Sequence, residues 1–198
     1  MMSPKKAKRG RPGKMNAESV LDTTIGAYWR SDPADVSINA ICEMAKVSKP
    51  ALYREFGNED GLMAAVLERY AERVLSEIFD ILAKAMPVPE TLNALTRFVC
   101  DSVTMETGCV FYKMRAGKHR LGPVTRSRGE AIDAGAVDAF NAYLAVRRLD
   151  GGRSNAVPTA AAARYLVEQL GLALTQRAAG EDPEQIRKTL QLALSAIR

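Results

Sequence analysis

Apolar residues recur at every third or fourth position along most of the chain, which is the spacing of amphipathic helices. The first such segment covers about residues 16–30, and Asp32-Pro33 ends it. No segment alternates with the two-residue period of a β-strand. The pattern therefore predicts an all-α protein. Further long helical segments are expected at about residues 59–86, 90–105, 108–117, 123–148, 158–179 and 183–197.

Two short helices are expected between the first segment and the long one. Ser37 is a suitable N-cap for a helix that carries Ile38 and Ile41 on one face. Lys46-Val47-Ser48 follows as a turn, and Ser48 caps a second short helix that ends at Phe56. Two short helices joined by such a turn predict a helix-turn-helix at about residues 37–56, whose second helix enters the major groove of DNA.

The exposed face of the second short helix carries side chains suited to DNA. Lys49 and Arg54 have the charge to meet phosphates or guanine edges. Ala51 is small enough to touch a thymine methyl, and Tyr53 has a hydroxyl to donate to a phosphate. With Ser48, these residues form the expected reading edge.

A long helix is expected next. Asn58 is its predicted N-cap, and Glu59 and Asp60 lie favourably at the positive end of its dipole. An apolar stripe continues to Met86, which gives a helix of about 42 Å at a rise of about 1.5 Å per residue. A helix of that length is able to join two domains.

The helix-turn-helix region carries a pattern made of Ser37-Ile38, Ile41, Ala45, Val47-Ser48-Lys49, Leu52-Tyr53, Phe56 and Leu62. This pattern resembles the signature of the tetracycline repressor (TetR) family. The resemblance implies an all-α homodimer in which an N-terminal three-helix DNA-binding domain is joined by the long helix to a C-terminal helical domain for ligand binding and dimerisation. It implies base or phosphate contacts for the reading edge, and Ser37 and Asn58 complete the expected DNA-facing set. The implied parts are a basic arm (1–15), the DNA-binding domain (16–60) and the C-terminal domain (61–198).

Two positions depart from the family pattern. Lys46 occupies a turn position that is usually glycine, and Glu59 stands where many relatives carry a phosphate-binding lysine. A carboxylate does not bind phosphate, so the expected role of Glu59 is to stabilise the helix dipole. Asn58 still leaves a backbone amide to face DNA.

The positive charge is concentrated at the N-terminus. The net charge is +5, yet the first fourteen residues hold six cations and no acid, so the rest of the chain is close to neutral. A basic arm indicates a polyanionic partner, and a solubilising tail is the alternative. Arg9-Gly10-Arg11-Pro12 is similar to the core of an AT-hook, which lies in the minor groove. Arg9, Arg11 and Lys14 are the expected DNA contacts of the arm.

Two further sets of residues are candidates in the C-terminal domain. The family resemblance assigns an apolar ligand pocket to the first set, although the same residues suit an ordinary core; they are Met105, Cys109, Phe111, Tyr112, Met114, Phe140 and Tyr143. The last two helices are apolar around much of their circumference, which predicts a dimer interface in addition to a core face. Its expected residues are Leu166, Leu170, Leu174, Leu190, Leu194 and Ile197.

The composition argues against several classes of protein. Three cysteines without a CxxC pair and a single histidine, His119, predict neither a disulfide framework nor a metal site, and no cofactor is expected. The absence of an apolar N-terminal segment disfavours secretion and membrane insertion, which indicates the cytoplasm. A thiol switch at Cys100 or Cys109 stays open as an alternative.

The sequence predicts a transcriptional regulator that is not an enzyme. We expect a dimeric repressor on a palindromic operator of double-stranded DNA, released by a partly apolar small-molecule inducer. A regulator that binds DNA without an effector is the alternative. An all-α enzyme is a weaker one, because the sequence has no paired carboxylates at metal-ligand spacing and no glycine-rich phosphate loop.

Overall fold

The computed structural model describes residues 15–149 and 157–197, and every regular element within those ranges is a helix. The predicted all-α fold is confirmed. Arg9, Arg11 and Lys14, the expected DNA contacts of the arm, lie outside the described residues. The α-helices are α1 (Ala17–Arg30), α2 (Ile38–Ala45), α3 (Lys49–Phe56), α4 (Glu59–Ala83), α5 (Val88–Asp101), α6 (Val110–Ala116), α7 (Pro123–Leu149), α8 (Thr159–Ala178) and α9 (Pro183–Leu194). Short 3-10 helices are η1 (Pro33–Asp35), η2 (Val103–Met105), η3 (Lys118–Arg120) and η4 (Ser195–Ile197).

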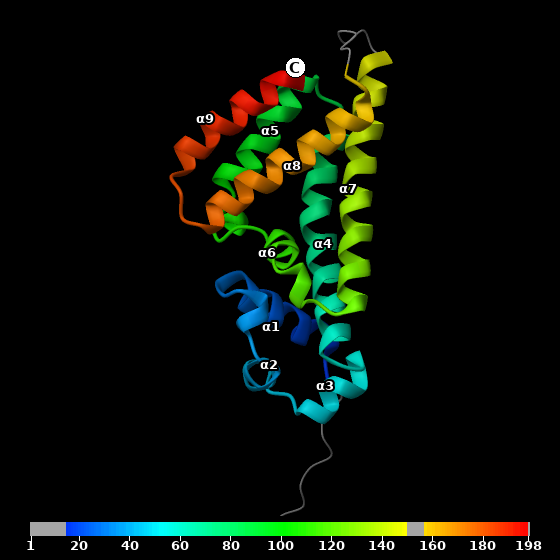
Figure 1. Cartoon of the computed structure of the whole chain (residues 1–198), viewed down its shortest axis with the longest axis vertical. Helices are drawn as coiled ribbons and strands as arrows, with labels where there is room; N and C mark the ends of the chain where they lie inside the picture. Colours follow the sequence, from blue (N-terminus) through cyan, green and yellow to red (C-terminus); the bar gives the residue numbers. More distant parts are fainter. Residues whose placement is uncertain (1–14, 150–156, 198) are drawn as a thin grey trace, which may run out of the picture.

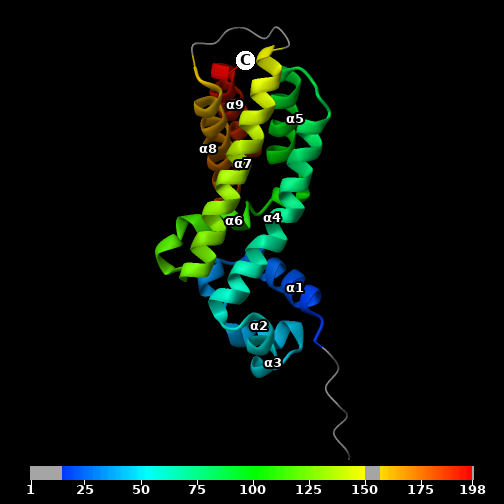
Figure 2. The same cartoon turned by 90° about the vertical axis from the view of Figure 1, so that its right-hand side faces the viewer.

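The helices form an elongated molecule with α1, α2 and α3 at one end (Figure 1). From that end α4 runs toward the opposite end, and α7 lies beside it and runs in the same direction (Figures 1 and 2). At the other end α8 packs against α7, and α5 and α9 pack against each other. The long helix α4 therefore belongs to both ends of the molecule.

The described helices end close to the predicted positions, although the segment expected at 183–197 ends as α9 at Leu194 and continues as η4, and two other segments also differ. Helix α4 stops at Ala83, three residues before Met86, and Ala85 beyond it adopts a left-handed conformation with φ of 54°. The segment expected at 90–105 divides into α5 and η2, because Ser102 between them is extended. These differences lie at helix ends, where local hydrogen bonding decides the boundary.

The predicted dimer residues of α8 and α9 are corrected by the structure. Their side chains are buried within the single chain, because α8 packs on α7 and α5 while α9 packs on α5 and α8. A side chain covered by its own chain does not form a contact with a second copy. The outward apolar residues of these helices are instead Leu172, 55% exposed, and Leu192, 75% exposed. The six corrected residues are Leu166, Leu170, Leu174, Leu190, Leu194 and Ile197.

Within the described ranges, no helix has both the length and the apolar character needed to cross a membrane.

Candidate nucleic-acid interface

The helix-turn-helix is held together by buried apolar side chains. Ile41 of α2 and Leu52 of α3 are at most 1% exposed and belong to the same apolar core, and the two helices contact each other. Lys46 ends α2 in the left-handed conformation, with φ of 55°, and its amide donates to the carbonyls of Cys42 and Glu43. Glycine adopts this conformation without steric cost, which is the physical reason that Lys46 is an unusual residue there.

The start of α3 presents the expected reading edge. The Ser48 side chain accepts a hydrogen bond from the Ala51 amide at 3.3 Å and so caps the helix. Lys49 and Arg54 are exposed, and Tyr53 is partly exposed. The Lys49 ammonium lies 5.5 Å from the centre of the Tyr53 ring, which brings a cation and a phenol onto one edge of the helix. This edge lies at the end of the molecule remote from α5 and α9 (Figure 1).

Ser37 and Asn58 flank this edge as helix caps. The Ser37 hydroxyl accepts from the Ala40 amide at 3.2 Å, and the Asn58 side chain accepts from the Gly61 amide at 2.9 Å. Both residues are exposed. Glu59 is the first residue of α4, where its charge favours the positive end of the helix dipole.

Asp60, expected only to stabilise the α4 dipole, also joins α4 to the start of α7. Its carboxylate accepts hydrogen bonds from the amides of Val124 at 2.9 Å and Thr125 at 3.0 Å, and the Thr125 hydroxyl lies 2.7 Å from it. A Cβ on Gly122 would lie 2.2 Å from the Asp60 carboxyl carbon, so the chain passes Asp60 where only glycine fits without movement. No local pattern in the sequence indicates that Asp60 meets this helix start.

The hydrogen bonds to Asp60 also change its acidity. Partial burial acts to raise the pKa of the carboxyl, but the bonds from Thr125 and Val124 and the charge of Arg126 outweigh it. The pKa of Asp60 therefore lies below its ordinary value, and the ionised form is the one that holds α7.

Two other contacts join the DNA-binding end to the same part of the C-terminal domain. The Lys113 ammonium of α6 donates to the Trp29 carbonyl at the end of α1, at 2.6 Å. Arg120 of η3 donates to the Ala34 carbonyl at 3.3 Å and lies 3.4 Å from the Asp35 carboxylate. We call these two contacts and the Asp60–Thr125 contact the junction. All its C-terminal residues lie between positions 113 and 125.

Five of the seven predicted ligand residues line one or both of two cavities. An apolar cavity of about 60 Å³ is lined by Cys109, Phe111, Tyr112 and Phe140, among others. This volume accommodates a few water molecules rather than a drug-sized ligand. A larger pocket of about 320 Å³ lies between α6, α7 and α8 and is lined by Phe111 and Met114 together with charged side chains that the sequence did not indicate.

Met105 and Tyr143 line neither of these two cavities. Met105 is fully buried in the core. The Tyr143 hydroxyl lies 3.0 Å from the Met86 carbonyl and 2.7 Å from the Thr91 hydroxyl, and so fastens α7 to the connection between α4 and α5. Tyr143 also lines a separate, open pocket beside Phe79 at the end of α4, so only Met105 has a purely core position.

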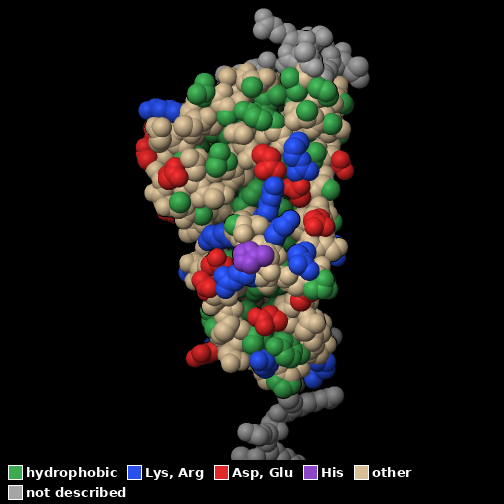
Figure 3. Space-filling model, viewed as in Figure 1, with side chains coloured by type: hydrophobic (Ala, Val, Ile, Leu, Met, Phe, Trp, Pro, Cys, Tyr) green, Lys and Arg blue, Asp and Glu red, His purple; other side chains and the backbone are tan. Residues whose placement is uncertain are grey.

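The two cysteines of the C-terminal domain lack the features of a reactive thiol. Cys100 and Cys109 are buried, and burial raises the pKa of both thiols, which favours the protonated form. His119 is exposed on η3, where Lys and Arg side chains gather around it (Figure 3). In the part of the chain that the structure describes, no three His, Cys, Asp or Glu side chains come close enough to hold a metal ion.

The family model for bacterial regulatory proteins of the tetR family matches the sequence of residues 20–66. This segment includes the whole helix-turn-helix and the start of α4. The likeness to the tetR family is thus shown for this N-terminal part of the chain. The chain is 35% identical over 68 residues to the HTH-type transcriptional repressor ComR of Escherichia coli, a match that spans 34% of this chain and 32% of ComR.

Solved structures extend the likeness to both ends of the molecule. The reduced form of E. coli NemR superposes with a TM-score of 0.81 at 16% identity, over 91% of this chain and 96% of that one. A cysteine mutant of CifR, a TetR-family regulator complexed with 26-base-pair operator DNA, gives a TM-score of 0.76 at 18% identity, over 95% of this chain and all of that chain. At these identities the likeness shows a shared fold.

Proposed function

We propose that this protein is a transcriptional regulator that binds double-stranded DNA through α3. The observation that carries the proposal is the exposed edge of Lys49, Tyr53 and Arg54, which projects from one end of the molecule on a helix anchored by buried Leu52. Phosphate contacts would position such a helix, and base contacts would specify the operator. The complex of CifR with its operator DNA, built on the same fold, supports this use of the helix-turn-helix.

We further propose that the protein acts as a homodimeric repressor in the cytoplasm. Two copies of α3 would read half-sites of a palindromic operator about 34 to 36 Å apart. The correction to the buried leucines moves the proposed dimer contact to the outward faces of α8 and its neighbours, where Leu172 is exposed.

The junction supplies a physical route for release by a small molecule. Its three contacts attach the DNA-binding end to residues 113–125, so a movement of that segment changes the position of α4 and, with it, α3. An effector needs a coupling free energy of about 1 to 3 kcal/mol to change DNA affinity substantially. We infer that an inducer acts by this route.

The proposal is tested by binding of the full chain to DNA from the region upstream of its own gene, measured by fluorescence anisotropy at fixed salt. Lys49→Ala and Arg54→Ala should each weaken specific binding by about 1 to 3 kcal/mol, because each removes a charged contact. Lys84→Ala, an exposed cation at the far end of α4, is the matched control and should bind as the wild type does. No binding at low salt would refute the function, and normal binding by both α3 variants would refute the reading edge.

A further inference from the structure

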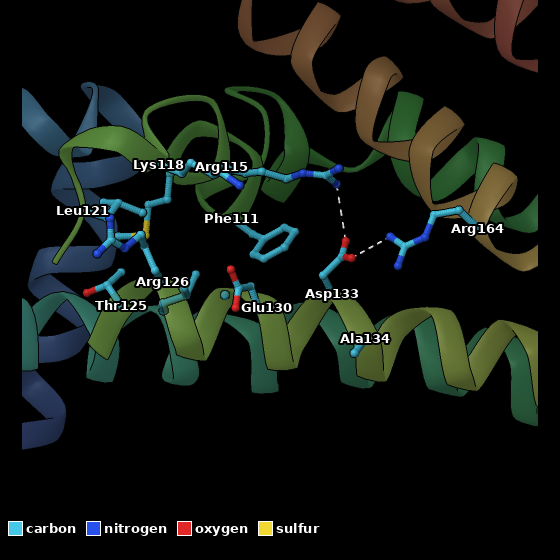
Figure 4. A pocket seen from close by; sticks show the side chains of 13 residues that line it. Phe111, Arg115, Lys118, Leu121, Thr125, Arg126, Glu130, Asp133, Ala134 and Arg164 are labelled. Atoms are coloured by element: carbon cyan, nitrogen blue, oxygen red, sulfur yellow. Dashed lines mark hydrogen bonds and ion pairs between the residues drawn. The ribbon is translucent and has the colours of Figure 1, made fainter. Parts of the chain in front are cut away.

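The 320 Å³ pocket between α6, α7 and α8 has an apolar floor (Figure 4). Leu67 of α4 and Met114 of α6 are almost completely buried, and Phe111 extends from α6 toward α7 across the pocket. A pocket of this size is at the lower end of the range for small-molecule sites. Its floor therefore suits a compact apolar body such as one aromatic ring.

The charges at one end of the pocket are already balanced. Arg115 and Arg164 both face Asp133, at 3.4 and 2.6 Å, and both also face Glu168, at 2.9 and 3.5 Å. Two cations and two carboxylates therefore satisfy one another there. Figure 4 shows Asp133 held between the two guanidinium groups. A cationic ligand would have to displace an arginine to reach this carboxylate.

The other end of the pocket has an excess of positive charge. Lys118 of η3 and Arg126 of α7 line it, with Glu130 as the acid on the same wall. The Lys118 side chain has no hydrogen bond or ion pair in the part of the chain that the structure describes. Arg126 is close enough to Asp60 to lower the pKa of that carboxyl, so its charge acts on the junction.

We propose that this pocket binds a small organic carboxylate with a compact apolar body, and that this is the effector of the regulator. The carboxylate lies between Lys118 and Arg126, and the apolar body rests against Phe111 and Met114. Charge-assisted hydrogen bonds to lysine and arginine supply the selectivity for an anion, and burial of the body supplies affinity. As an effector assignment, the inference rests on the proposed function; as a binding site, it stands on the pocket alone.

The position of the site connects it to the junction. Thr125 lines the pocket and also holds Asp60 through its amide and hydroxyl. Arg126 is the next residue and lines the same pocket. A ligand that moves the start of α7 would therefore disturb the hydrogen bonds of Val124 and Thr125 to Asp60, which join α7 to α4.

The test uses the full chain without DNA. Benzoate, phenylacetate and cinnamate are titrated by ligand-observed NMR and calorimetry, alongside their primary amides and inorganic phosphate. We expect carboxylates to bind at millimolar concentration or below, and the matched amides to bind at least about tenfold more weakly. Inorganic phosphate should compete weakly, because it lacks the apolar body.

Variants place the binding in this pocket. Lys118→Gln and the double variant Lys118→Gln/Arg126→Gln should weaken carboxylate binding by about tenfold or more, because each removes charge at the proposed head-group site. Lys188→Gln, at an exposed cation of α9, is the matched control and should bind as the wild type does. Circular dichroism checks that each variant is folded.

Four results would overturn the inference: no carboxylate binds, amides bind equally well, phosphate displaces the carboxylates at equal concentration, or the Lys118 and double variants bind normally. The DNA-binding assay is separate from this test. If the chain bound carboxylates but no DNA, the proposed function as a regulator would be refuted and the carboxylate site would still hold. DNA binding by a chain that binds no carboxylate would refute the site alone.

Discussion

Two helix starts in this protein are capped in opposite ways. At α3 the Ser48 hydroxyl accepts from the Ala51 amide, only three residues away. At α7 the cap is the Asp60 carboxylate, which accepts from Val124 and Thr125, 64 and 65 residues away. The DNA-binding end is thus built from local hydrogen bonds, whereas its attachment to the C-terminal domain depends on distant ones. A change at the first kind of site alters one helix, and a change at the second alters how two domains meet.

The largest effect is expected for a substitution within the locally built end. Leu52→Ala removes a side chain with no exposed surface and should lower the free energy of unfolding by about 2 to 5 kcal/mol, because it leaves a cavity between α2, α3 and α4. Urea denaturation followed by circular dichroism measures the loss. A loss no larger than that caused by an exposed alanine substitution would contradict the described packing.

A methyl group at the distant cap should have the next largest effect. Gly122→Ala places a Cβ against the Asp60 carboxyl carbon and should cost about 1 to 3 kcal/mol of stability by forcing the carboxylate away. Gly117→Ala is the matched control, because the nearest atom to its Cβ is 3.8 Å away. Equal stability of the two variants in thermal unfolding would contradict the close approach at Gly122.

Neutralising the distant cap should have a smaller, pH-dependent effect. Asp60→Asn should cost about 1 to 2 kcal/mol near pH 7, because charge-assisted hydrogen bonds to Val124 and Thr125 become neutral ones. The folded pKa of Asp60 is lowered, so its contribution is complete above the ordinary pKa of aspartate and is lost as pH falls through the folded pKa. Stability measured from pH 7 down to about pH 3 should therefore fall less in the variant than in the wild type. If the stability of the variant and of the wild type fell equally with pH, the charge of Asp60 would have no role in stability.

The smallest effect is expected at the turn of the helix-turn-helix. Lys46→Gly removes the steric cost of a left-handed lysine but increases the entropy of the unfolded chain, and a net gain of about 0.5 kcal/mol should remain. Denaturant midpoints of the two proteins measure it. A clear loss of stability would show that the Lys46 side chain makes a stabilising contact.

The same contrast explains which features the sequence predicts. Ser37, Ser48 and Asn58 are predictable as caps because each acceptor lies three residues from its donor, so spacing alone identifies the pair. The contact of Asp60 with Thr125 is not predictable in this way, because no local pattern indicates which distant amides a carboxylate will meet. The charged wall of the pocket is not predictable for the same reason. Arg164 of α8 and Asp133 of α7 are distant in the sequence and meet only in the folded chain.

The correction at α8 and α9 has a related cause. An apolar stripe such as Leu166, Leu170 and Leu174 shows that a helix face is covered, but not whether its own chain or a second copy covers it. Only the positions of α5 and α7 decide that question. Leu172 follows the buried Gly171 and points outward, although the apolar stripe alone does not distinguish it from the buried leucines.

The three junction contacts hold the DNA-binding end at three separate points, which are the end of α1, η1 and the start of α4. When all three are intact, the helix-turn-helix is fixed relative to α7. Loss of the Asp60 contact would leave the contacts at Trp29 and Ala34, together with the continuous helix α4, to hold the helix-turn-helix against the C-terminal helices.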